Sequence, residues 1–132
     1  MKSIFLPGSG YKKQSRFIAM LWTLLIFTGC LYPGRELPHV DVPLIDKWTH
    51  FVMFGLFGFL WLCAYPEGGV RNMIKWFVIA VAVGGVIEGL QVALTFLGRS
   101  MELMDVVADA VGALLGVGLF AAGAAWAGRR AT

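Results

Sequence analysis

Eight side chains that could bind an ion or transfer a proton lie within, or at the ends of, long apolar segments of this sequence. They are Asp46, Lys47, His50, Glu88, Gln91, Arg99, Asp105 and Asp109. A charged side chain at the centre of a bilayer costs about 2.5–3.5 kcal/mol on insertion scales, so such residues usually mark a functional site. We expect catalytic roles for His50, Glu88 and Asp105, and binding roles for the remaining five, Asp46, Lys47, Gln91, Arg99 and Asp109.

The elements that carry these residues are predicted by composition and by apolar runs. Of the 132 residues, 58% are hydrophobic and only 14% are charged, and the mean hydropathy is +0.75, values too apolar for an ordinary small soluble domain. The pattern predicts an all-α, polytopic membrane protein with one domain over residues 1–132. Its four transmembrane helices are expected near residues 16–32, 47–65, 73–97 and 105–127.

The distribution of basic residues predicts the orientation. Eight basic residues fall on one side of the predicted membrane, and they are Lys2, Lys12, Lys13, Arg16, Arg71, Lys75, Arg129 and Arg130. Three fall on the other side, namely Arg35, Lys47 and Arg99. The positive-inside rule therefore places both termini in the cytoplasm. Because the basic residues cluster at helix ends rather than along one face, we expect no nucleic-acid partner.

The two cysteines do not predict a disulfide framework. Cys30 and Cys63 are expected near opposite membrane faces, so they should not pair. The segment Phe27-Thr28-Gly29-Cys30 is similar to a bacterial lipoprotein signal that ends at a lipidated cysteine. We favour an uncleaved first helix, and lipidation of Cys30 stays open.

The spacing of the polar residues places them at one depth. Asp46 and His50 are four residues apart and share a face at the outer end of the second helix. Asp105 and Asp109 repeat this spacing at the outer end of the fourth. At 1.5 Å of rise per residue, His50 and Asp109 lie about 6 Å below the outer ends of their helices.

Glu88 is predicted to lie deepest. It precedes Leu97 by nine residues, or about 14 Å, and is three residues from Gln91. An ionised and isolated carboxylate at that depth is costly, so Glu88 should either carry a proton or pair with His50 or Arg99. We expect Glu88 to belong to the site.

Glycines indicate which helix faces pack. Gly112 and Gly116 continue the stripe of the two aspartates on the fourth helix. On the third, Gly84 and Gly85 lie one turn below the glutamate, and Gly85-x-x-x-Gly89 is a second small-residue pattern. We therefore expect the polar cluster to lie above a tightly packed glycine seam, facing the bundle.

Several residues also have ordinary structural interpretations. Asp46 and Asp105 could cap helices, Lys47 could extend to lipid headgroups, and His50 could simply orient Glu88. The acids and His50 could hold a divalent cation in oxygen-rich coordination. However, no compact metal-binding motif is present, so we predict no metal site, and the cofactor is unknown.

In order and spacing, these residues resemble the VanZ-like family of bacterial membrane proteins. The resemblance covers about residues 46–116 and rests on Asp46-Lys47-x-x-His50, Glu88-x-x-Gln91, Gly98-Arg99 and Asp105-x-x-x-Asp109-x-x-Gly112. The chain departs from the family at Asp109, where Asn is usual. The resemblance implies a multi-pass protein of the bacterial inner membrane, with membrane lipids as its surroundings.

The resemblance also implies a setting for the function. The founding member is associated with low-level resistance to teicoplanin, which acts on cell-wall precursors outside the membrane. Some members have been labelled phosphotransbutyrylases, but this sequence contains no phosphate-cradling loop and no acyl-CoA site.

Three functions remain open at this stage. The first is an enzyme acting on a lipid-linked envelope intermediate, in which Lys47 and Arg99 hold an anionic group while Glu88 and His50 exchange protons. The second is a binding or transport protein, which would need a homodimer because four helices are few. The third is a structural subunit for another protein. We favour an outer-leaflet site for an anionic, cell-wall-related intermediate.

Overall fold

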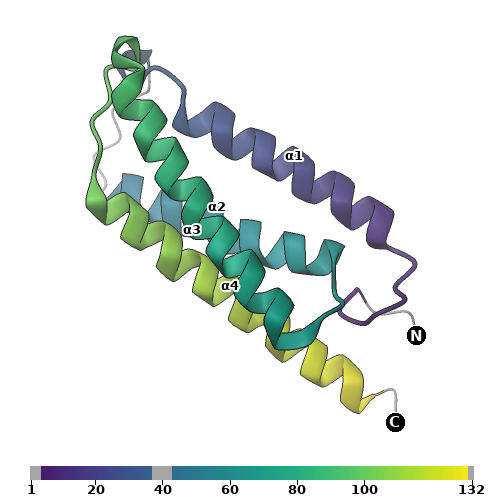
Figure 1. Ribbon diagram of the computed structural model, residues 1–132. Helices are drawn as coiled ribbons and strands as arrows, with labels where there is room; N and C mark the ends of the chain where they lie inside the picture. Colours follow the sequence, from purple (N-terminus) through teal and green to yellow (C-terminus); the bar gives the residue numbers. More distant parts are fainter. Residues whose placement is uncertain (1–3, 37–42, 131–132) are drawn as a thin grey trace.

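The computed structural model describes residues 4–36 and 43–130, and this part of the chain contains helices and no strands. This part consists of four long helices and two short 3₁₀ helices, and Figure 1 shows how the long helices are arranged. In chain order they are α1 (Lys12–Cys30), η1 (Gly34–Glu36), α2 (Ile45–Ala64), α3 (Gly69–Ala93), η2 (Thr95–Leu97) and α4 (Leu103–Arg129). The all-α prediction is confirmed.

Three of the helices, α2, α3 and α4, are long and apolar enough to cross a membrane. α1 is not in this group, because its first turns include Lys12, Lys13 and Arg16. The multi-pass prediction therefore has direct support from three helices. A fourth span and the cytoplasmic location of both termini stay predictions.

The helix ends differ from the expected ones by a few residues. α1 begins at Lys12 rather than near residue 16. α3 ends at Ala93 rather than at residue 97, because a 3₁₀ turn follows and Gly98 then adopts the left-handed conformation, with φ of 61°, that redirects the chain. α4 begins at Leu103, so Glu102 directly precedes its first turn.

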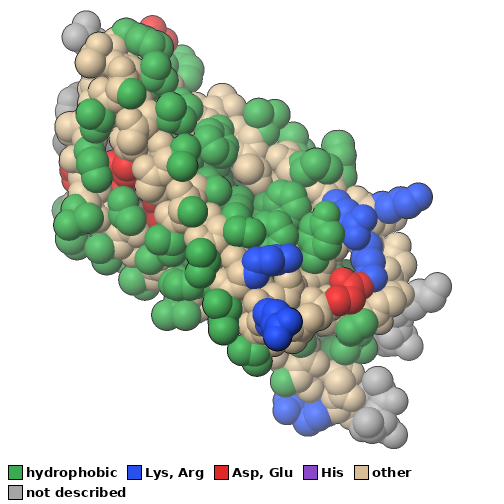
Figure 2. Space-filling view, in the orientation of Figure 1, with side chains coloured by type: hydrophobic (Ala, Val, Ile, Leu, Met, Phe, Trp, Pro, Cys, Tyr) green, Lys and Arg blue, Asp and Glu red, His purple; other side chains and the backbone are tan. Residues whose placement is uncertain are grey.

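Successive helices run in opposite directions, so α2 and α4 are parallel to each other (Figure 1). We call the end at which α1 begins and α4 ends the basic end, because Lys and Arg gather there in Figure 2. We call the opposite end, where α2 and α4 begin and α3 ends, the polar end. The first residues of α1 and the last residues of α4 thus lie at the same end of the bundle, as a four-span topology requires.

α2 and α4 contact each other through their backbones. A Cβ at Gly112 would overlap the carbonyl oxygen of Phe51, and a Cβ at Gly116 would overlap that of Gly55. Glycine permits this close approach because it has no side chain. The predicted packing role of Gly112 and Gly116 is therefore confirmed.

The second glycine pattern behaves differently. Nothing lies within 4 Å of a Cβ built at Gly85 or at Gly89, so this pair does not form a packing seam within the chain. Gly84 is the closely packed glycine of α3, and its neighbour is a side chain of the candidate site. A pattern of small residues indicates where helices could approach, but it does not indicate how the helix is rotated.

Aromatic side chains attach α1 to the other helices. The indole nitrogen of Trp22 donates a hydrogen bond to the carbonyl oxygen of Met53 at 2.9 Å. Trp61 donates in the same way to the hydroxyl of Thr23 at 3.0 Å, and its ring stacks on Trp76 with centroids 4.6 Å apart. These contacts fix α1 against α2 and bring α3 to the same cluster.

The loop between α2 and α3 is also tied to α1. Lys12 forms an ion pair and hydrogen bond with Glu67 at the basic end, and this bond lowers the pKa of the Glu67 carboxyl from its usual value. Cys30 and Cys63 are both free and buried, in agreement with the prediction that they do not pair.

The α2–α4 contact generates a stability prediction. Gly116→Ala should destabilise the purified protein by about 1–3 kcal/mol, because the new methyl group overlaps backbone that cannot rotate away. Gly118→Ala is the matched control: nothing lies within 4 Å of its Cβ position, so it should be neutral or stabilise by up to about 1 kcal/mol. Unfolding of both variants in detergent measures the difference, and equal effects would contradict the close approach.

The orientation generates a second prediction. With Cys30 and Cys63 replaced by serine, a cysteine introduced at Ser100 should react with a membrane-impermeant maleimide on intact cells, and one at Glu67 should react only after lysis. The opposite pattern would place the polar end in the cytoplasm.

Candidate functional site

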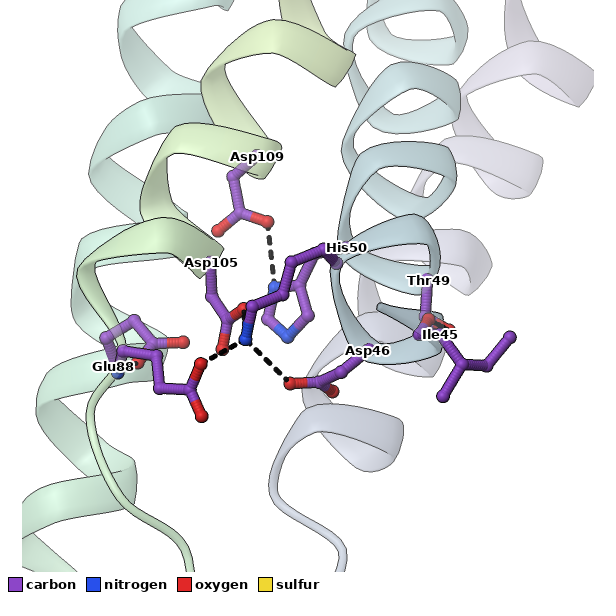
Figure 3. Close-up of polar contacts among 9 residues, drawn as sticks. Ile45, Asp46, Thr49, His50, Glu88, Asp105 and Asp109 are labelled. Carbon is purple, nitrogen blue, oxygen red and sulfur yellow. Dashed lines mark hydrogen bonds and ion pairs between the residues drawn. The ribbon is translucent and has the colours of Figure 1, made fainter. Parts of the chain in front are cut away.

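A buried histidine–aspartate pair joins α2 to α4 at the polar end. Nδ1 of His50 lies 2.8 Å from Oδ1 of Asp109, and the two residues are 3% and 1% exposed. With the ring nitrogen donating to the carboxylate, the other nitrogen, Nε2, is free to accept a proton or bind a metal ion. Figure 3 shows Nε2 turned away from Asp109, toward Asp46 and Asp105.

A lysine lies among the acids above this pair. Nζ of Lys47 is 2.9 Å from Oδ1 of Asp105 and 3.6 Å from Oδ2 of Asp46, and it also pairs with Glu102. Asp105 is buried, Asp46 is half-buried, and Glu102 is exposed. The ammonium group of Lys47 is thus held by carboxylates and faces the cluster.

Glu88 reaches the cluster from α3. It is fully buried, and its Oε2 accepts a hydrogen bond from the backbone N–H of Glu102 at 3.1 Å. Its other oxygen, Oε1, has no hydrogen-bond partner among the described residues. In Figure 3 the carboxyl group of Glu88 is directed toward Asp105. Glu88 was expected to pair with His50 or Arg99. Its hydrogen-bond partner is instead the backbone amide of Glu102, at the start of α4.

Gln91 and Arg99 have a different role. The side-chain amide of Gln91 donates to the carbonyl oxygen of Cys30 at 2.8 Å, and Nε of Arg99 donates to that of Tyr32 at 3.2 Å. Both bonds fasten the end of α3, or the loop after it, to the end of α1. Of the eight predicted site residues, five lie together in one cluster: Asp46, Lys47, His50, Asp105 and Asp109. Glu88 lies beside this cluster. The described contacts of Gln91 and Arg99 are with the end of α1 and not with the cluster.

Glu102 was not identified from the sequence, and Gly84 was placed in the glycine seam without its contact with Asp109. Glu102 lies three residues before Asp105, a helical spacing that could have indicated it. A Cβ at Gly84 would collide with Oδ2 of Asp109, so this glycine makes room for the carboxylate. Oδ2 itself is buried without a hydrogen-bond partner among the described residues.

The cluster carries more negative than positive groups. Five carboxylic acids, Asp46, Glu88, Glu102, Asp105 and Asp109, surround one lysine and one histidine. Asp46 and Asp105 stand in the first turns of α2 and α4, where the parallel helix dipoles are positive. Each such placement contributes about 0.3–1 kcal/mol, which reduces the cost of the acids but leaves their charge excess.

An apolar groove leads away from the cluster between α2 and α4. The part of the groove nearest the polar end has a volume of about 400 Å³, and its lining includes Lys47, Trp48, Phe51 and Ala108. A second hollow of about 260 Å³ shares Phe51 and continues along the same two helices to Leu119. Lys47 therefore belongs both to the groove and to the charged cluster.

The chain belongs to the VanZ/LLP1 family, whose family model matches residues 5–124. The match confirms the family resemblance seen in the motifs. No curated protein and no solved structure matches the chain. Family membership and the three apolar helices together indicate a multi-pass membrane protein.

The His50–Asp109 geometry predicts how this chain responds to the family's usual residue. Asp109→Asn keeps an acceptor oxygen for Nδ1 of His50, so stability should stay within about 1 kcal/mol of the parent. Asp109→Leu leaves the buried N–H without an acceptor and should cost about 1–3 kcal/mol.

Thermal unfolding in detergent measures both effects, and ¹⁵N NMR of the imidazole reports whether Nδ1 keeps its proton. Equal destabilisation by the two substitutions would show that the charge of Asp109, rather than its acceptor oxygen, is required.

Proposed function

We propose that this VanZ/LLP1 protein binds a long-chain, lipid-linked intermediate of the cell envelope and holds the headgroup at the polar end of the bundle. The observation that carries the proposal is the continuity between the apolar groove and the charged cluster at Lys47. A groove that ends in a set of ionisable groups matches a molecule with one long apolar part and one polar end.

The shape of Lys47 supports this proposal. Lys47 lines the groove, while its ammonium group contacts Asp105 and Glu102. Long basic side chains commonly divide in this way between an apolar surface and a polar boundary. A lipid chain in the groove would therefore lead its headgroup directly to the acids and to His50.

The charge distribution supports the outer leaflet as the location. If the basic end faces the cytoplasm, the polar end lies at the opposite side, where teicoplanin acts on cell-wall precursors. This location agrees with the family resemblance, which implies a role connected with resistance to the glycopeptide teicoplanin.

The headgroup would meet a mixed electrostatic environment. Lys47 is a cation, but its charge is shared among several carboxylates. An anionic headgroup would need additional positive charge to bind strongly. Nε2 of His50 is the group best placed to act on a bound headgroup, because Nδ1 is engaged by Asp109 and Nε2 faces the cluster.

Photo-crosslinking can test lipid binding. In nanodiscs, a photoactivatable polyprenyl phosphate should label the wall of the α2–α4 groove more strongly than a photoactivatable diacyl phospholipid does. Ala108→Trp, which fills the groove, should reduce this labelling about tenfold, since losing contact with only two methylene groups costs about 1.6 kcal/mol.

Ala122→Trp is the matched control, an exposed alanine on α4 outside the groove, and it should label like the parent protein. Equal labelling by both lipids, or equal loss in both tryptophan variants, would assign the groove to ordinary bilayer lipid and reject the proposal. Lipid analysis of cells with and without the gene should reveal an accumulated envelope intermediate if the proposal holds.

A further inference from the structure

We propose that Asp46, His50 and Asp105 form a binding site for a divalent transition-metal ion at the polar end. One ligand atom from each of these three residues lies within 4.8 Å of the other two. The residues come from the first two turns of α2 and the first turn of α4, so the site joins these parallel helices. The inference goes beyond lipid binding and does not depend on it.

The histidine is oriented as metal-binding histidines usually are. In such sites the ring nitrogen that does not bind the metal donates to a carboxylate or carbonyl, which fixes the tautomer and the ring direction. Asp109 provides this carboxylate for His50 at 2.8 Å, and Gly84 leaves space for it. In the neutral ring the remaining nitrogen, Nε2, is then unprotonated, and it faces Asp46 and Asp105 (Figure 3).

A second observation, separate from the three proposed ligands, is the carboxylate of Glu88, which reaches the site from α3. It is fully buried, and its Oε1 has no hydrogen-bond partner among the described residues. Figure 3 shows this carboxyl group directed toward Asp105. When it is ionised, a buried carboxylate oxygen without a donor requires a positive charge or a further donor nearby, and a cation held by Asp105 supplies that charge.

Lys47 identifies where the ion would lie. Its ammonium group lies 2.9 Å from Asp105 and 3.6 Å from Asp46, so it contacts two of the three proposed ligands. A metal ion and this ammonium group would compete for the same carboxylates. Binding of the ion would move Lys47 toward Glu102, with which it already pairs.

The ligand types indicate the class of metal. Two carboxylates and one imidazole suit Zn²⁺ or Mn²⁺ better than Ca²⁺, which prefers an all-oxygen set. Ligand atoms about 2.0–2.2 Å from a metal are at most about 4.4 Å apart, so the three residues would need to approach by only a few tenths of an ångström. The side chain of Asp46 is 49% exposed at the start of α2 and can provide this adjustment.

The test uses purified protein in detergent, stripped with EDTA and without added lipid, so that its outcome is separate from that of the lipid experiment. Titration with Zn²⁺ by calorimetry, and with Mn²⁺ by electron paramagnetic resonance, should show one saturable ion per chain. Asp105→Asn and His50→Gln should each weaken the affinity at least tenfold. The control is Glu36→Gln, an exposed acid at the same end, which should leave the affinity unchanged.

Lys47→Met keeps the proposal testable if the ligand variants fail to fold. Removing the competing ammonium group should strengthen Zn²⁺ binding at least tenfold, and Zn²⁺ should raise the melting temperature of Lys47→Met more than that of the parent. Absence of saturable binding in both proteins would overturn the proposal. Unchanged affinity in Asp105→Asn, or a Lys47→Met protein that Zn²⁺ does not stabilise, would overturn it too and assign the role of permanent cation to Lys47.

Discussion

The arrangement of this protein depends on the contact between the backbones of α2 and α4. Gly112 and Gly116 bring α4 against the carbonyl oxygens of Phe51 and Gly55, at a separation that a single methyl group would prevent. His50 directly precedes Phe51, and Asp109 is one turn before Gly112, so the same contact sets the 2.8 Å distance between the histidine and the aspartate. The polar groups are therefore positioned by the apolar seam below them.

The parallel direction of α2 and α4 explains how so many acids can be placed together. Two positive helix ends lie side by side, and the amide at the start of α4 binds Glu88 from a third helix. These features reduce the free-energy cost of burying the acids but do not neutralise their charge. A site with this balance favours cations, and a cation would in turn allow an anionic headgroup to approach. The proposed headgroup site and the proposed metal site thus share one electrostatic constraint.

Helical periodicity predicted the parts of the site that depend on a single helix. The spacing of four residues correctly placed Asp46 with His50 and Asp105 with Asp109, and the stripe continued correctly to Gly112. The position of α3 was harder to predict, because its apolar residues surround the helix and do not define its rotation. Gly85 was therefore expected in a seam that Gly84 occupies alone, and Glu88 was assigned partners other than Glu102. The contact between Glu88 and Glu102 depends on the path of the loop before α4, which the spacing of residues within a helix does not predict.

The separation of 59 residues between His50 and Asp109 has a consequence for biogenesis. At a synthesis rate of about 5–20 residues per second, α2 emerges roughly 3–12 s before the aspartate that completes its histidine. During this interval the only acid next to Lys47 in its own helix is Asp46, and the imidazole has no acceptor from α4. The polar face of α2 is therefore unmatched by α4 during this time. A nascent chain interrupted before α4 would keep that face unpaired.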